Sequence, residues 1–362
     1  MSTAPEPAQH ENGTLTRTLL IVIFVGLLIG TAGAVIRLPY AVLLPGPVSN
    51  VLGQTVTSDG QSKPVITVTG HETFPTDGTL DFTTVRIMGG PGYAVNVWDV
   101  LRAWVDPAQD VYPVDKIFPP QVSQQEVQEE NEAQMVDSQQ EATAVGLRAA
   151  GFTVGQKITV SSVADGAPSG TTFQAGDVLV SVGGTPVTDA ASVTGAVQKA
   201  TPGSVLDVVV ERAGAQVPLQ AKTGTSSERR TVLGIRLKVD FVFPFTVTID
   251  PGSVGGPSAG LMFSLGVYDT VTTGALTGGK NVAGTGTIDS AGDVGAIGGI
   301  RQKLVGAQRG GASYFLAPAD NCPDVRGAVP DGLQVVKVAT FDDARTAVTK
   351  IAAGDTGTLP AC

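Results

Sequence analysis

Ser258 occupies a position suited to nucleophilic chemistry. It follows the tight corner Gly255-Gly256-Pro257, and the apolar residues after it predict a helix through Tyr268. Backbone N–H groups at a helix start lack intrahelical partners, and the helix dipole favours negative charge there. A hydroxyl at this place suits attack on a carbonyl, with the N–H groups of Gly256 and Ser258 as donors to the oxyanion, because Pro257 has none.

A serine nucleophile needs a base, and histidine is scarce in this chain. The two histidines are His10 and His71, and neither lies in a supporting motif. Lys303 is the better candidate, because burial lowers the pKa of a lysine and leaves it neutral near pH 7. It lies beside the apolar stripe of a predicted helix, 300–309. We therefore predict that Lys303 accepts the proton of Ser258.

Four motifs follow one another in this half of the chain. They are Gly256-Pro257-Ser258-Ala259-Gly260; Thr285-Gly286-Thr287-Ile288; Gly298-Gly299-Ile300-Arg301-Gln302-Lys303-Leu304; and Arg309-Gly310-Gly311 with Pro318-Ala319-Asp320-Asn321. Together they resemble the proteolytic domain of Lon proteases. The resemblance implies that Ser258 is the nucleophile, Lys303 the base and Thr285 a side chain that holds the lysine. Lon-type domains assemble as rings, commonly hexameric, so the resemblance also implies a homo-oligomer.

The chain departs from the Lon pattern just before the Gly-Pro-Ser motif. Many members carry Lys-Asp before Gly-Pro-Ser, whereas this chain has Val254-Gly255-Gly256, which removes an acidic neighbour of the nucleophile. The segment 274–280 has the glycine and lysine spacing of a phosphate-binding loop, but Asn281 stands where a metal-binding Ser or Thr is needed. We therefore expect no ATPase module and no ATP, and we assign no other cofactor and no metal site.

Composition limits the classes of partner. The 362 residues suggest two or three domains. The net charge of -10 and the pI near 4.7, without a cluster of Lys and Arg, argue against a nucleic-acid surface.

An uncharged apolar run, 19–36, lies between Arg17 and Arg37. At about 1.5 Å per residue it nearly spans a hydrocarbon core of about 30 Å, which predicts a transmembrane helix over 18–36 after a cytoplasmic tail, 1–17. A cleaved signal peptide is the alternative, because Ala32-Gly33-Ala34 fits a cleavage site. We favour the uncleaved anchor because the apolar run continues past that site. One arginine at each end leaves the orientation open, and the short tail favours an extracytoplasmic body.

The only two cysteines are Cys322 and Cys362. They could form a disulfide if the body lies outside the membrane, and two free thiols are the alternative.

The segment 158–223 resembles a PDZ domain. The pattern Ala175-Gly176-Asp177-Val178-Leu179 followed by Gly183-Gly184 precedes a predicted helix and two further strands. PDZ domains bind an extended peptide beside a sheet edge, for substrate recruitment or for gating of access. The candidate contacts are Phe152, Val154, Val193 and Val197, and a role as core residues is an equal alternative for each.

The predicted fold is α+β, with a transmembrane helix, a PDZ-like β-sandwich or barrel, and a Lon-type α/β proteolytic domain. The segment Met135-Val136-Asp137-Ser138-Gln139-Gln140-Glu141-Ala142 resembles a helix that precedes the active-site half of Lon domains, which suggests that the PDZ-like segment interrupts the catalytic fold. The expected divisions are an extended linker (37–59), the first part of the Lon-like fold (60–150), the PDZ domain (151–226), the Lon-like proteolytic domain (228–350) and a C-terminal tail (351–362).

These patterns predict an ATP-independent serine endopeptidase of the bacterial cell envelope. Its single-pass anchor would leave most of the chain outside the cytoplasmic membrane, where unfolded or membrane-associated proteins and peptides are the expected substrates. The alternative is a membrane-anchored PDZ scaffold with a catalytically idle Lon-like domain. The intact pair of Ser258 and Lys303 favours the enzyme.

Overall fold

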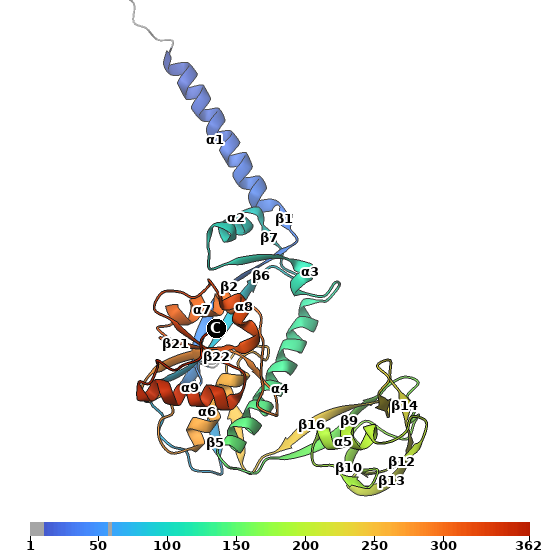
Figure 1. Ribbon diagram of the computed structural model, residues 1–362. Helices are drawn as coiled ribbons and strands as arrows, with labels where there is room; N and C mark the ends of the chain where they lie inside the picture. The colour runs from blue at the N-terminus through green and yellow to red at the C-terminus, as the bar shows by residue number, and fades with distance from the viewer. Residues whose placement is uncertain (1–10, 57–59) are drawn as a thin grey trace, which may run out of the picture. The chain divides into compact units, whose positions relative to one another are not determined.

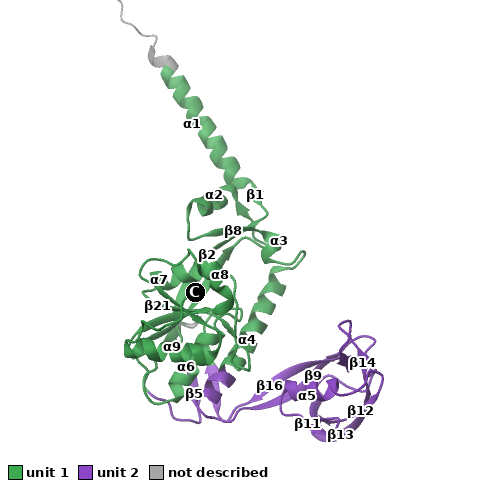
Figure 2. Cartoon of the chain, in the orientation of Figure 1, with its two compact units in different colours: residues 1–66, 75–142, 249–362 green, residues 67–74, 143–248 purple. Residues whose placement is uncertain are grey.

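The computed structural model describes residues 11–56 and 60–362 and has the predicted mixed α+β class (Figure 1). The chain forms two compact units, coloured separately in Figure 2. Unit 1 comprises residues 1–66, 75–142 and 249–362, and unit 2 comprises residues 67–74 and 143–248. Residues 1–10 of the expected cytoplasmic tail lie outside the described residues.

Unit 1 contains a six-stranded sheet. Four neighbouring strands are parallel, and the last two pair antiparallel. In sheet order the strands are β22 (Gln334–Val338), β21 (Tyr314–Pro318), β18 (Asn281–Gly284), β6 (Thr79–Met88), β2 (Tyr40–Asn50) and β8 (Asp110–Pro113). Short antiparallel pairs join β1 (Arg37–Leu38) to β7 (Val95–Asn96), β3 (Gln54–Val56) to β4 (Ser62–Pro64) and β19 (Thr287–Ile288) to β20 (Val294–Gly295).

Helices cover both faces of this sheet. Ala283 of β18 belongs to an apolar cluster with Ile300 and Leu304 of α7, whereas the next residue, Gly284, lies against Met262 of α6. Successive residues of a strand point to opposite faces, so α6 and α7 lie on opposite sides of the sheet. The helices of this region are α6 (Gly260–Val271), α7 (Ile300–Arg309), α8 (Cys322–Val325) with the 3-10 turn η1 (Ala319–Asn321), and α9 (Phe341–Ala353).

The expected linker over 37–59 is instead part of the folded unit. β2 pairs with both β6 and β8, and Ala41, Val42 and Leu43 are buried. Its register shifts between Pro45 and Val48, because Pro45 and Pro47 have no N–H to donate to a ladder. Prolines that suggested a linker are therefore accommodated in an irregular strand.

The N-terminal apolar segment forms helix α1, Glu11–Val35. Within it, Leu15–Val35 is long and apolar enough to cross a membrane, and its side chains are almost all exposed. Helix α2 (Val97–Val105) packs beside it, and α3 (Val114–Ile117) follows β8.

Helix α4, Gln124–Ala149, begins with a capping box. The Ser123 N–H donates to the Glu126 carboxylate at 2.8 Å, and the Glu126 N–H donates to the Ser123 hydroxyl at 3.2 Å. The first half of α4 is exposed and rich in Gln and Glu, whereas Met135, Ser138 and most later residues are buried. The exposed, polar part of α4 is thus limited to the start of the helix.

Unit 2 is a six-stranded sheet with one helix against it. The strands are β13 (Ala215–Lys222), β12 (Val205–Arg212), β10 (Val178–Val182), β9 (Gly155–Val163) and β16 (Ile235–Val242), in that order, with β11 (Thr185–Pro186) on β10 and helix α5 (Ala190–Gln198). Two short pairs, β14 (Gly224–Thr225) with β15 (Thr231–Val232) and β5 (Ile66–Thr69) with β17 (Thr246–Ile249), complete the chain.

The sheet of unit 2 extends beyond the expected PDZ boundary at residue 226. β16 pairs antiparallel with β9 along eight residues, and Ile235, Leu237 and Val239 pack against the core of the unit. Alternate residues of β16 face that core, so this segment belongs to unit 2. The expected division had placed it in the Lon-like proteolytic domain, 228–350.

Candidate active site

The corner before α6 holds Ser258 at the start of the helix, half-buried. Gly260 lies so close to neighbouring elements that a Cβ there would come within 2.8 Å of the Ser138 hydroxyl and 2.9 Å of an Ile288 methyl. The small residues after Ser258 therefore allow α4 and β19 to approach the corner that carries this serine.

Helix α4 is hydrogen-bonded to the backbone on both sides of this corner. The Gly256 N–H donates to the Asn131 carbonyl at 2.9 Å, and the Ser138 hydroxyl donates to the Pro257 carbonyl at 3.1 Å. The Ser258 carbonyl accepts from the Gly286 N–H at 2.9 Å. Among the described residues, the Ser258 N–H has no acceptor.

Lys303 reaches the serine from α7, on the other side of the sheet. Its side chain is buried, with 2% of its surface exposed, and Nζ lies 2.7 Å from Ser258 Oγ. Nζ also donates to Thr285 Oγ1 at 2.9 Å and to the Thr83 carbonyl at 3.1 Å. The two residues that sequence analysis paired are thus in direct hydrogen-bond contact, with Thr285 beside them.

Burial lowers the pKa of Lys303 from its ordinary value of 10.5 to about 7. The charged form loses hydration that no carboxylate within the described part of the chain replaces, so the neutral amine is favoured.

The hydrogen-bond pattern matches a neutral amine. Thr285 Oγ1 donates its hydrogen to the Ser258 carbonyl at 2.9 Å, so it accepts from Nζ, and the Thr83 carbonyl can only accept. These two acceptors use both hydrogens of a neutral amine. Its remaining lone pair is then available to the Ser258 hydroxyl, which is the geometry of a general base.

Thr83 of β6 and Asn131 and Ser138 of α4 contact the site, and the sequence assigned none of them a role there. Thr83 and Asn131 contribute backbone carbonyls, which every residue type has, so no sequence signal could have found them. Ser138 had a weak signal, because it lies in the segment that resembles the helix before the active-site half.

A cleft of about 530 Å³ opens over Ser258 and Lys303. Strand β6 forms one wall, and the corner before α6 forms another. Its other lining residues include Phe82, Thr84, Val85, Arg86, Asn131, Val254 and Gly298. The walls are mixed apolar and polar, and the serine hydroxyl lies in the cleft.

Unit 2 has its own cavity, of about 440 Å³, between α5 and the segment 226–237. Val193 and Val197 line it, whereas Phe152 and Val154 do not. Val154 is buried, and the ring of Phe152 packs edge-on against His71 at 4.9 Å between centroids. The residues opposite α5, chiefly Leu233 and Ile235, come after the predicted boundary of the PDZ domain.

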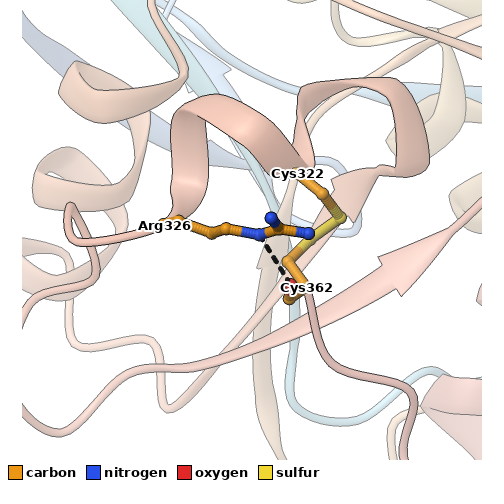
Figure 3. The surroundings of a disulfide bond; sticks show 3 residues. All are labelled: Cys322, Arg326 and Cys362. Atoms are coloured by element: carbon orange, nitrogen blue, oxygen red, sulfur yellow. Dashed lines mark hydrogen bonds between the residues drawn. A yellow bond between two sulfur atoms is a disulfide. The ribbon is translucent and has the colours of Figure 1, made fainter.

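Cys322 and Cys362 are joined in a disulfide in the structure (Figure 3). The Arg326 guanidinium reaches toward the chain end and donates to the Cys362 carbonyl at 3.4 Å. The bond therefore holds residues after α9 against α8, and Cys362 packs on the apolar cluster that includes α7.

The chain is similar to proteases. A model of the family described as Lon protease (S16) C-terminal proteolytic domain matches residues 165–350, just over half of the chain. The chain therefore belongs to this family, which confirms the predicted membership. The matched residues include the PDZ-like segment from residue 165 onward, as well as Ser258 and Lys303.

Individual relatives are much longer proteins. Lon protease of Azospirillum brasilense is 33% identical over 161 residues, which cover 43% of this chain and 19% of the relative. Lon protease of Fusobacterium nucleatum is 37% identical over 92 residues, 24% of this chain and 12% of the relative. The chain thus matches a fifth or less of the length of these relatives.

Two solved structures are similar to this chain over 22% of its length. The PDZ domain of an SdrC-like protein from Listeria monocytogenes is 17% identical and covers 22% of this chain and 85% of that domain, with a TM-score of 0.21. A protein from Geobacillus thermodenitrificans is 20% identical with the same coverage of this chain, 94% coverage of its own and a TM-score of 0.21.

Proposed function

We propose that this chain is a serine endopeptidase that uses Ser258 as nucleophile and Lys303 as general base. The observation that carries the proposal is the 2.7 Å contact between Nζ and Oγ, made by an amine whose pKa burial lowers to about 7. A serine hydroxyl becomes an effective nucleophile when an adjacent base takes its proton.

In this mechanism, the neutral amine of Lys303 accepts the Ser258 proton as Oγ attacks a peptide carbonyl. The resulting ammonium donates that proton to the leaving amine, and an acyl-enzyme remains. Water then attacks the acyl carbon with Lys303 again as base. Thr285 and the Thr83 carbonyl hold Nζ throughout, so the lysine keeps its position while its charge changes.

The Ser258 N–H is the first donor for the oxyanion, since it has no acceptor among the described residues. The Gly256 N–H is engaged with the Asn131 carbonyl at 2.9 Å. Gly256 therefore has to leave Asn131 before it can become the second donor, and a small rotation of this glycine corner on substrate binding would achieve that.

We assign the proteolytic domain to the segments of unit 1 that lie before and after residues 143–248 of unit 2 in the sequence. The hydrogen bonds from α4 to Gly256 and Pro257, and the position of β6 between β2 and β18, support a catalytic fold interrupted by unit 2. Unit 2 would then recruit substrates or gate access as a PDZ domain, with Val193 and Val197 at its cavity. Phe152 and Val154 pack within the unit, which favours a core role for them.

The enzyme would be anchored by α1, with its body outside the cytoplasmic membrane, and would work without ATP. The apolar length of α1 and the disulfide between Cys322 and Cys362 support this location, because disulfides persist in oxidising compartments. Unfolded or membrane-associated proteins and peptides are the proposed substrates, and a homo-oligomeric ring is the assembly that the family suggests.

Incubation of the detergent-solubilised full chain with unfolded casein, without ATP, tests the proposal. Wild type should cleave casein, whereas Ser258→Ala and Lys303→Met should not, with unchanged melting temperatures. Cleavage that persists in a folded Ser258→Ala variant would refute the dyad. A wild-type chain that binds peptides without cleaving them would leave the scaffold as the function.

A further inference from the structure

Helix α2 lies beside the C-terminal end of α1 (Figure 1). It carries several large apolar side chains that are exposed. Soluble proteins seldom expose several large apolar side chains on one short helix without a partner. Both tryptophans of the chain belong to this surface. The exposed side chains, called here the α2 apolar face, are Trp98 (40%), Leu101 (40%), Trp104 (71%) and Val105 (81%).

The α2 apolar face is one continuous arc. Successive residues of an α-helix are rotated by about 100°, which places its four members within an arc of about 120°. Val100 and Ala103 lie outside that arc and are buried with Val42 and Val95. Arg102 is exposed at the edge of the arc. The helix thus has one side in the core, one apolar side open and a cation between them.

Direct contacts fix the position of α2 along the axis of α1. The Trp98 indole N–H donates to the Gly30 carbonyl at 3.0 Å. At Gly33 a Cβ would come within 2.4 Å of the same indole nitrogen, so only glycine allows this packing. Both glycines belong to the apolar span Leu15–Val35. Gly30 lies five residues before the end of that span, or about 7.5 Å at the rise of an α-helix.

We propose that the α2 apolar face docks on the phospholipid bilayer that α1 crosses, at the interface near the C-terminal end of α1. The inference rests on the proposed membrane anchor. If α1 spans the bilayer, Trp98 lies at the depth of its last turns, where tryptophan and an amphipathic helix are most stable. Arg102 is then placed to meet lipid phosphates. This second attachment restricts rotation of unit 1 about α1.

Tryptophan fluorescence of the full chain in phosphatidylcholine–phosphatidylglycerol vesicles tests the docking. Trp98→Phe leaves Trp104 as the only tryptophan, and Trp104→Phe leaves Trp98, which reports on insertion of the anchor. Brominated lipids quench a tryptophan in the bilayer, and aqueous iodide quenches one in water. Docking predicts that brominated lipid lowers Trp104 emission by about half or more, with little effect of iodide.

Three results would overturn the inference, each for a different reason. Quenching of Trp104 by iodide alone, with Trp98 quenched by brominated lipid, would mean that the anchor inserts but α2 does not dock. If brominated lipid quenched neither Trp104 nor Trp98, the proposal that α1 is a membrane anchor would itself be refuted. Protection of Trp104 from both quenchers would mean that protein, such as a second copy of the chain, covers the face.

A matched pair of substitutions separates docking from general surface effects. Leu101→Glu places a charge within the α2 apolar face and, in the Trp98→Phe background, should restore iodide quenching of Trp104. Val329→Glu alters an apolar side chain of similar exposure, 42%, outside α2 and should leave the quenching unchanged. Unaltered melting temperatures of both variants would show that they are folded. Equal quenching in both variants would also contradict the proposal.

Discussion

The rate of peptide cleavage is expected to follow the ionisation of Lys303. Only the neutral amine can accept the Ser258 proton, and burial lowers its pKa to about 7. The neutral fraction then rises from about one tenth at pH 6 to about nine tenths at pH 8, so kcat/KM should rise about tenfold and level off. A lysine with an ordinary pKa of about 10.4 would give about a hundredfold rise over the same range and no plateau.

The assay is the pH dependence of kcat/KM on a fluorogenic peptide without titratable side chains. Glu141 needs a control, because burial and the charges of Asp289 and Asp137 raise its pKa to about 7. Glu141→Gln should keep the wild-type profile if Lys303 is the group that titrates. A profile that still rises tenfold per pH unit above pH 8, or one that Glu141→Gln flattens, would refute the assignment.

Three further predictions concern the surroundings of the site and the stability of unit 1. Thr285→Val removes the hydroxyl that accepts a hydrogen bond from Lys303 and should lower kcat about ten- to hundredfold, because an unsatisfied buried donor costs about 1–3 kcal/mol. Thr285→Ser keeps the hydroxyl and should retain most of the activity. Equal losses in both variants would contradict this role. Cys362→Ser opens a link across 40 residues. It should lower the unfolding free energy by about 2–4 kcal/mol, visible as a lower melting temperature that matches reduced wild type, and an unchanged melting temperature would show that the bond adds nothing. Burial raises the pKa of Asp269 from 3.8 to about 6. The folded state therefore keeps a proton that the unfolded state has lost, and stability falls as pH rises through about 4 to 6. Asp269→Asn should gain melting temperature relative to wild type between pH 4 and pH 7, and a difference that does not change with pH would count against this.

Local patterns predicted several elements and paired two side chains that lie in contact in the structure. The helix expected over 300–309 is α7, Ile300–Arg309, because apolar spacing and the preceding glycines act over a few residues. Ser258 and Lys303 were paired by residue type and motif, and Nζ lies 2.7 Å from Oγ. The predicted α+β class also follows from such local signals.

Strand partners could not be predicted in the same way. The segment 37–59 looked like a linker because of its prolines, and its place as β2 depends on pairing with β6 and β8. β16 was assigned to the catalytic half by its sequence position, and its pairing with β9 places it in unit 2. Register and pairing are set by side chains that meet across the sheet, which the spacing within one strand does not reveal.

The sequence alone determined which functional groups this protein has available, a hydroxyl at a helix start and an amine on a second helix. It also indicated a family of proteins in which such motifs occur together. Only the tertiary structure decided that the amine is buried and that its third contact is the Thr83 carbonyl, 220 residues earlier in the chain. The pKa of a lysine depends on the water and acceptors around it. The acceptors around Lys303, and the elements that exclude water from it, come from strands and helices distant in sequence. Residue types can therefore indicate a candidate lysine, but only packing can lower its pKa enough to make it neutral.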